Sequence, residues 1–391
     1  MVLMRRKLIQ LAGKTLVVSL PKKWVENFNL KKGMEVEVEE DKDKLIISTE
    51  KQEIKEKKEI DITGFPRRLI EISIRSAYEA GYEEIKLYFE NETTMDLKRN
   101  KSVKVMDIIR EETSKLIGVE IIEQGKQHCV IKEITSSTGK DFDKILRRIF
   151  FLVFDMTNDI YEIIQTGLPN SDPTNIEFKH TTIKKFILYC LRLLNKIGYK
   201  EFRKTTLLYN YLGVIEEITD DYEYAILEYL KYNNRLNNKL IELLGQHKGK
   251  QEHKGKHKSK QGSDKNKQSV ELFESKDLFI EAISLTNQIV RGALELYHSY
   301  TRDGVSKVYL LRRRIFNHIN ALKERALGVG EDKKNKGENK GNKATNSKVK
   351  GNIENESSNE LLVLYLMFIE KLAYITHLTQ KLIDLKEAML S

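Results

Sequence analysis

The sequence predicts a multidomain, mainly helical protein that begins with a small β-rich unit. Apolar and polar residues alternate over residues 1–50, and strand-like and helix-like stretches alternate over residues 59–134. From about residue 140 to the end, apolar residues recur every three or four positions, which is the period of an amphipathic helix. A chain of 391 residues has room for two or three domains, and 40% hydrophobic residues are enough to build buried cores.

Residues 1–50 predict a strand, a short helix and a hairpin. Pro21 ends the strand, because proline cannot continue a central strand but suits the first turn of a helix. The segment "KKWVENFNL" gives one or two helical turns, and Gly33 breaks the chain after it. "MEVEVEEDKDKLIIS" then predicts a hairpin with its turn near residues 41–43. About fifty residues in this order cannot bury a good core alone, so we expect the unit to dimerise.

A charged linker over residues 51–58 leads into a small α/β domain, residues 59–134. Its pattern predicts the strand "EIDIT", a helix from about 66 to 80, the strand "EIKLYF" and a helix from about 103 to 117. A hairpin through residues 124–126 follows. We can assign no chemistry to this domain from its residues.

The helical region predicts two units of three helices each, residues 140–244 and 273–391, as an internal duplication of architecture. The helices are expected at about 144–166, 174–197, 204–232, 275–301, 305–326 and 359–389. Gly198 is a candidate C-cap of the second helix. Two lysine-rich tracts, 245–272 and 328–358, lack the apolar residues that would offset the entropy of ordering, so we expect disordered inserts there.

The net charge of +10 is weak evidence for nucleic-acid binding. Residues 245–270 hold eight lysines against two acids, and residues 328–358 hold seven against five, so these tracts carry +6 and +2 of the net charge.

No apolar run is long enough for a transmembrane helix, and we recognise no signal peptide. Cys129 and Cys190 lie far apart and predict reduced cysteines in a cytoplasmic protein.

Basic residues crowd the first part of the N-terminal unit, where residues 1–32 hold eight bases against Glu26 alone. The stretch resembles the AbrB/MazE/SpoVT family of DNA-binding domains. The resemblance is carried by Gly13-Lys14, by Leu20-Pro21-Lys22-Lys23 and by Leu30-Lys31-Lys32-Gly33. It implies that two chains interleave their hairpins into one swapped-hairpin β-barrel. It also implies that basic residues of the first half face DNA, here Arg5, Arg6, Lys7, Lys14, Lys22 and Lys23.

Two pairs of acids lie four residues apart in the helical region, and residues at this spacing share a helix face. The pairs are Asp155 with Asp159 and Glu216 with Asp220; Glu217 with Asp221 forms a second register. Acids beside an apolar stripe are usually solvated. Like charges that gather there repel unless a cation or protons intervene, and carboxylates of helical bundles can hold metal ions. The spacing leaves both interpretations open.

The order of helices and acids resembles PhoU, the phosphate-uptake regulator. The matching segment is Ile215-Glu216-Glu217-Ile218-Thr219-Asp220, and the corresponding acid of the second unit is replaced by Tyr374. The resemblance implies iron or zinc in the first unit only, at Asp155, Asp159, Glu216 and Asp220. An AbrB-like domain followed by a PhoU-like region looks like the arrangement of archaeal phosphate regulators.

The function expected from both resemblances is a dimeric DNA-binding regulator of phosphate uptake, with promoters of phosphate-transport genes as its DNA. A PhoU-type adaptor that restrains a phosphate ABC transporter or sensor kinase without binding DNA is the alternative. An antitoxin-like repressor is a third interpretation, although antitoxins are short. A di-metal enzyme is a fourth, because Glu177 with His180 and Glu295 with His298 fit a Glu-x-x-His pattern. We expect no enzyme, since no nucleophile–base constellation is recognisable.

Overall fold

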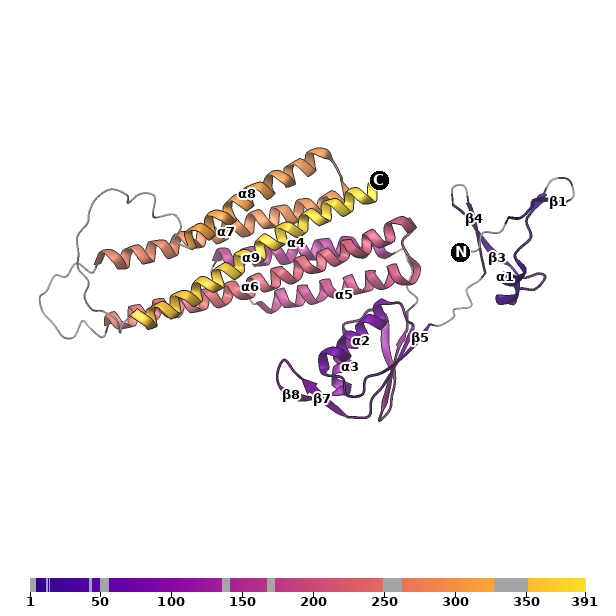
Figure 1. Ribbon diagram of the computed structural model, residues 1–391, viewed down its shortest axis with the longest axis horizontal. Helices are drawn as coiled ribbons and strands as arrows, with labels where there is room; N and C mark the ends of the chain where they lie inside the picture. Colours follow the sequence, from indigo (N-terminus) through magenta and orange to yellow (C-terminus); the bar gives the residue numbers. More distant parts are fainter. Residues whose placement is uncertain are drawn as a thin grey trace, which may run out of the picture. The chain divides into compact units, whose positions relative to one another are not determined.

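The computed structural model describes residues 5–11, 13, 15–41, 44–49, 56–135, 141–166, 173–248, 262–326 and 351–391. The chain divides into two compact units, Met1–Glu56 and Lys57–Ser391 (Figure 1). The first unit is small and rich in strands. The second contains a small α/β domain and six long helices.

The N-terminal unit consists of two hairpins with a short helix between them. The elements are β1 (Ile9–Leu11), β2 (Thr15–Val17), α1 (Lys22–Asn27), β3 (Val36–Asp41) and β4 (Lys44–Thr49). β1 pairs antiparallel with β2, and β3 pairs antiparallel with β4. Pro21 directly precedes α1 with φ of −64°, as the sequence predicted. Gly33 follows the helix with φ of +92°, a conformation that favours glycine.

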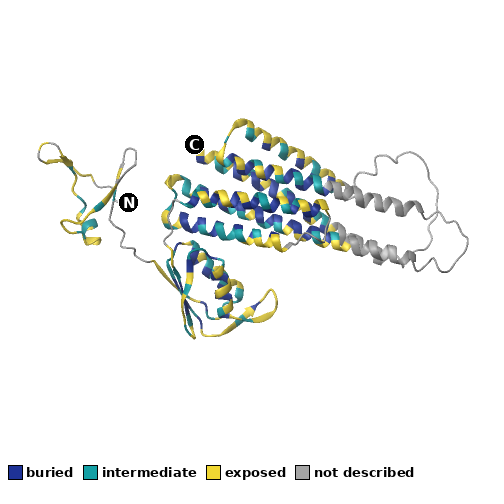
Figure 2. Ribbon diagram, turned by 180° about the vertical axis from the view of Figure 1, so that it is seen from behind, coloured by how far each residue is buried: buried dark blue, intermediate teal, exposed yellow. Residues whose placement is uncertain are grey.

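The two hairpins of the N-terminal unit remain separate two-stranded sheets in the single chain. The predicted barrel is therefore not closed by the described residues of one chain. The swapped-hairpin barrel that the AbrB/MazE/SpoVT resemblance implies needs strands from a second chain. It therefore stays a prediction. The unit also lacks a core of its own, because none of its described side chains is buried (Figure 2).

The α/β domain has a four-stranded sheet with the strand order β5-β6-β10-β9, in which β5 and β6 run parallel and the other pairs antiparallel. Its elements are β5 (Lys57–Asp61), α2 (Arg67–Glu79), β6 (Glu84–Tyr88), α3 (Val105–Ser114), β9 (Val119–Gln124) and β10 (His128–Glu133). These agree with the predicted order. A further hairpin of β7 (Thr93–Asp96) and β8 (Lys101–Lys104) was not predicted.

Six long helices form the rest of the second unit. They are α4 (Phe142–Thr166), α5 (Pro173–Ile197), α6 (Thr205–Lys248), α7 (Gly262–His298), α8 (Arg302–Ala326) and α9 (Gly351–Leu390), with a short 3₁₀ helix, η2 (Phe202–Lys204), before α6. Gly198 directly follows α5; its φ is +74°, and its amide donates to the Leu194 carbonyl oxygen. Gly198 is thus the predicted C-cap.

The edges of the predicted inserts differ from the structure. α6 continues to Lys248, α7 begins at Gly262, and α9 begins at Gly351, all within ranges expected to be disordered. Lys, Gln and Glu are good helix formers, so a helix can continue beyond its apolar stripe into such a sequence. Residues 249–261 and 327–350, the central parts of both inserts, lie outside the described residues.

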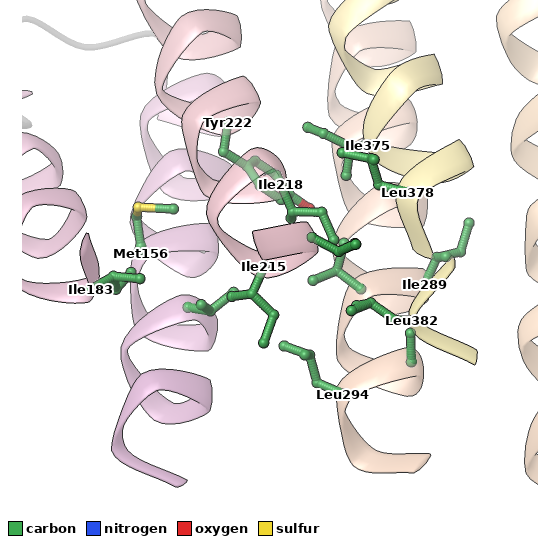
Figure 3. Packing of buried hydrophobic residues seen from close by; sticks show 14 of the residues in the cluster. Met156, Ile183, Ile215, Ile218, Tyr222, Ile289, Leu294, Ile375, Leu378 and Leu382 are labelled. Atoms are coloured by element: carbon green, nitrogen blue, oxygen red, sulfur yellow. The ribbon is translucent and has the colours of Figure 1, made fainter. Parts of the chain in front are cut away.

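One hydrophobic core runs through all six helices. α6 and α9 lie side by side along it, and both contribute fully buried residues (Figure 1). Figure 3 shows Ile215 and Ile218 of α6 and Leu378 and Leu382 of α9 in this core. The two predicted sets of three helices therefore share one interior.

The α/β domain packs against α5 through a second core, which includes Leu188 of that helix. Arg192 of α5 strengthens this contact, since its guanidinium donates to the Tyr78 carbonyl oxygen at 2.6 Å and to Glu133 at 2.9 Å. The Arg192 side chain is only 1% exposed.

No described helix combines the length and the apolar composition that a membrane-spanning segment requires.

Candidate functional site

The basic residues of the N-terminal unit are exposed and lie around β1 and α1. Arg5, Arg6 and Lys7 precede β1, and Lys22 and Lys23 form the first turn of α1. Ile9 pairs with Val17, so the segments before β1 and after β2 leave the hairpin at the same end. The segments that lead to the two predicted basic clusters thus leave the hairpin at one end. Lys14, the remaining candidate, lies outside the described residues.

Acidic partners for these cations are scarce among the described residues. Lys22 Nζ lies 3.7 Å from Glu26 Oε1, and both side chains are well exposed, so the pair contributes little. Arg5, Arg6, Lys7 and Lys23 form no ion pair with any described residue. Unpaired exposed cations can neutralise phosphates and release the counterions that a nucleic acid carries. The geometry fits phosphate contacts, which position a protein on DNA.

Apolar side chains are exposed on the same unit to an unusual degree. The large ones are Leu8, Ile9, Leu11, Leu16, Val18, Phe28, Met34, Val38 and Leu45, each at least 44% exposed. Large apolar side chains exposed in such number on a small unit are typical of an interaction site. They fit the expected second copy of the unit, whose hairpins would cover them.

The four acids predicted as metal ligands lie on α4 and α6, and basic residues of α5 compensate them. Lys179 Nζ lies 2.7 Å from Asp155 Oδ2 and 2.6 Å from Asp159 Oδ2. Burial opposes the charge of Lys179, but its hydrogen bonds to both acids outweigh this effect and raise its pKa. A single ammonium group thus occupies the place between the first pair of carboxylates.

The second pair is compensated by two residues of α5. Lys184 Nζ lies 2.9 Å from Asp220 Oδ1 and 3.4 Å from Glu216 Oε1. His180 donates from Nε2 to Asp220 Oδ1 at 2.7 Å, and its Nδ1 lies 3.1 Å from Glu223 Oε1. Burial of the ring opposes its charge, but the two acids outweigh it and raise the pKa of His180 to about 9. The pKa of Asp220 is lowered in turn, since His180 and Lys184 outweigh its own desolvation.

The second register of acids on α6 faces α9 instead. The Asp221 side chain is buried and lies 2.6 Å from Lys371 Nζ, and burial raises the pKa of its carboxyl despite that lysine. The hydroxyl of Tyr374 donates to Glu217 at 3.4 Å. Tyr374 stands where the predicted PhoU-type pattern expects an acid, and its hydroxyl joins α9 of the second set of three helices to α6 of the first set.

Metal ions fit this arrangement poorly. In the part of the chain that the structure describes, no three His, Cys, Asp or Glu side chains form a group that could hold a metal ion. Iron or zinc at Asp155, Asp159, Glu216 and Asp220 would have to displace the ammonium groups of Lys179 and Lys184. Iron or zinc at these four residues stays a prediction from the resemblance.

The two Glu-x-x-His matches take part in different contacts. His180 belongs to the network with Asp220, whereas His298 packs against the rings of Phe150 and Tyr297. Lys179 and Lys184 of α5 were not among the predicted site residues, and His180 was named only for the di-metal pattern. The partners of these residues lie 20 to 43 positions away along the chain, so spacing within one helix carries no signal for them.

Comparison with known proteins bears on the N-terminal unit. Residues 9–59 match the model of a family described as antidote-toxin recognition MazE, bacterial antitoxin. No curated protein and no solved structure matches the chain. The matched range covers both hairpins and α1 and reaches β5. The N-terminal unit therefore carries a domain of the MazE/AbrB type, as its sequence indicated, whereas the PhoU-type resemblance of the helical region remains a prediction.

Proposed function

We propose that the protein is a dimeric transcription regulator that binds DNA through its MazE/AbrB-type domain. The supporting observation is the surface of that domain, where exposed cations without acidic partners among the described residues accompany an apolar surface that one chain does not bury. Two copies would cover the apolar residues of both. Each copy would contribute Arg5, Arg6, Lys7, Lys22 and Lys23, and a two-fold protein reads two half-sites.

The finer part of the proposal is that the regulated genes serve phosphate uptake, with the helical region as the part that senses phosphate status or binds a partner. It rests on the PhoU-type order of α4–α6 and α7–α9 and on the acid motif at Glu216 and Asp220. A phosphate ABC transporter or sensor kinase is the partner class that the same resemblance implies. If the helical region alone carries the function, the protein is an adaptor and its N-terminal domain serves only to dimerise it.

The test is fluorescence anisotropy of the full chain on labelled promoter DNA of phosphate-transport genes and on scrambled DNA, over a series of salt concentrations. We expect tighter binding to the promoter. Lys22→Ala/Lys23→Ala should weaken binding at least tenfold and reduce the slope of log K against log salt by about 2, one for each phosphate that is no longer neutralised.

The control variant is Lys98→Ala/Lys101→Ala, which removes the same charge from exposed positions of the α/β domain. It should bind like the unmodified chain. Equal affinity for both DNAs, or equal weakening in both variants, would contradict a specific role of the N-terminal domain and favour the adaptor.

A second candidate function is an antitoxin-type repressor, because the matching family model is described by antidote-toxin recognition. It predicts a toxin encoded beside this gene, and a stable complex when both are produced together. Size-exclusion chromatography of the co-produced pair tests it. Separate elution of the two proteins would exclude this function.

A further inference from the structure

A cavity of about 220 Å³ lies at one end of the helical bundle. Both sets of three helices line it. Arg147 of α4 and Lys204 of η2 come from the first set, and His298 of α7 and Lys386 of α9 come from the second. Tyr297 of α7 also lines the cavity. No spacing in the sequence points to this site, because its residues belong to helices far apart along the chain and meet only where those helices end.

The charges around the cavity leave an excess of cations. The carboxylate that lines it, Asp143, accepts hydrogen bonds from the Tyr199 hydroxyl at 3.0 Å and from Lys200 Nζ at 2.9 Å. Lys204 pairs with Glu201 at 2.7 Å. Arg147 and Lys386 have no described acid within ion-pair distance, although Asp143 acts on Arg147 and Glu201 acts on Lys386 over a longer range. Among the described residues around the cavity, the cations therefore outnumber the acids by two: Arg147, Lys200, Lys204 and Lys386 against Asp143 and Glu201.

The pKa shifts agree with this distribution of charge. Burial lowers the pKa of Lys386, and the neighbouring Lys204 lowers it further, while Glu201 opposes both effects without cancelling them. Burial also lowers the pKa of His298, with further contributions from Arg147 and Lys386 that outweigh the opposing effect of Asp143. The Lys386 ammonium group faces the Tyr297 ring, 4.7 Å from the ring centroid. An anion in the cavity would relieve the repulsion between these groups.

The volume of the cavity and its hydrogen-bond donors limit the class of ligand that it can hold. A single water needs roughly 10–15 Å³, and drug-sized ligands occupy pockets of about 300–1,000 Å³, so this cavity suits something between them. A guanidinium can donate two parallel hydrogen bonds to a phosphate, and an ammonium group adds a point charge. Tyr297, which lines the same cavity, carries a hydroxyl group, a further type of hydrogen-bond donor.

We infer that this cavity binds a small, multiply charged oxyanion of the phosphate type, held by Arg147 and Lys386 with Lys204 beside them. The anion is inorganic phosphate or the phosphoryl group of a small metabolite. Because the cations come from both sets of helices, a bound anion ties the two sets together at this end of the bundle. The inference rests on the proposed function, to which it adds the signal that the helical region would sense.

The test is isothermal titration calorimetry of the full chain with inorganic phosphate, glycerol 3-phosphate and chloride at matched ionic strength. We expect saturable binding of at least one phosphate compound and none of chloride. Tighter binding of inorganic phosphate identifies the free anion, and tighter binding of glycerol 3-phosphate identifies a phosphorylated metabolite. No saturable binding of either compound overturns the inference.

The site is tested with Arg147→Gln/Lys386→Met, which should weaken binding at least tenfold. Arg148→Gln/Lys381→Met removes the same charge from exposed positions on the same two helices, α4 and α9, and should bind like the unmodified chain. Lys204→Met is a second site variant in case the double variant does not fold. Unchanged binding in folded site variants would place the anion elsewhere, for example on the basic N-terminal unit, and would overturn the inference.

DNA binding measured on the same samples separates this inference from the proposed function. Promoter binding without anion binding would overturn the anion site and leave the regulator intact. Anion binding that is abolished in Arg147→Gln/Lys386→Met, together with no preference for promoter DNA, would support the anion site and contradict the regulator.

Discussion

His180 is held as a cation between α5 and α6 by Asp220 and Glu223. Its pKa of about 9 in the folded chain exceeds the ordinary value of 6.5, so protonation stabilises the fold. This contribution is fully present below about pH 6.5 and is lost as the pH rises through 9. We expect His180→Gln to lower the free energy of unfolding by about 1.5–3 kcal/mol at pH 6, the range of a hydrogen bond to a charged group.

The difference in the free energy of unfolding between His180→Gln and the unmodified chain should shrink towards zero at about pH 9.5, above the pKa of His180 in the folded chain. Urea unfolding followed by circular dichroism at both pH values measures it. His377→Gln is the control, because that ring is exposed on α9. A difference that stays the same at both pH values would show that packing of the ring, and not its charge, stabilises the fold.

Substitution of Arg192 should lower the free energy of unfolding more than substitution of His180. The Arg192 guanidinium is buried between α5 and the α/β domain and stacks 4.8 Å from the centroid of the Tyr78 ring. Arg192→Met leaves the Tyr78 carbonyl oxygen without this donor, while Glu133 keeps Lys196 at 2.7 Å. We expect the free energy of unfolding to fall by about 2–4 kcal/mol, slightly less than for a buried charge left alone.

Urea unfolding beside Arg148→Met, an exposed arginine of α4, tests this expectation. A decrease below about 1 kcal/mol for Arg192→Met, the range of an ordinary surface substitution, would contradict a structural role of the buried guanidinium.

At the scale of the residue, the sequence could predict the acid pairs of α4 and α6 but not the basic residues of α5 that compensate them. The pairs Asp155 with Asp159 and Glu216 with Asp220 are visible as i, i+4 spacings within one helix. Lys179, which joins the first pair, belongs to another helix, and only the packing of α5 against α4 brings it there. In the sequence, Arg192 likewise looks like one more charge on an amphipathic helix, and only the α/β domain that covers it shows its role.

At the scale of the element, α6 carries the packing that unites the two sets of helices. Leu212 of α6 is fully buried in the shared core, and Leu227 of the same helix is 44% exposed. Leu212→Ala should lower the free energy of unfolding by about 2–5 kcal/mol, because it removes buried methyl groups and leaves a cavity. Leu227→Ala, the same substitution at an exposed position, should cost less than about 1 kcal/mol.

Urea unfolding of both leucine variants gives the measurement. Since one core runs through α4 to α9, we also expect this part of the chain to unfold in a single transition. A helical signal that disappears in two separate steps, with only the first shifted by Leu212→Ala, would contradict the shared core.

Elements with a strong hydrophobic period could be predicted from the sequence, and those without one could not. The helices α4 and α5 lie within a few residues of their predicted ranges, because an apolar stripe runs along their whole length. The hairpin of β7 and β8 has no comparable alternation, since "TTMD" and "KSVK" hold one large apolar residue each. The first turns of α9 likewise carry few apolar residues and were expected to be disordered.

At the scale of the whole molecule, the second unit contains both buried cores, whereas the described residues of the N-terminal unit form none. The full chain should therefore be a dimer held together by the N-terminal unit. Leu11→Glu/Leu16→Glu places charges on its exposed apolar surface, where each side chain is more than half exposed and a charge costs little in a single chain. In a dimer the same charges would be buried without partners.

We expect sedimentation velocity to show a dimer for the unmodified chain and a monomer for this variant, with the circular dichroism of the helical region unchanged. The control is Leu97→Glu, because Leu97 of the α/β domain is 72% exposed and lies outside the matched domain. It should remain a dimer. A monomeric unmodified chain, or a variant that still dimerises, would show that another surface covers the apolar residues of the N-terminal unit. Loss of DNA binding together with the dimer would connect the oligomeric state to the proposed reading of two half-sites.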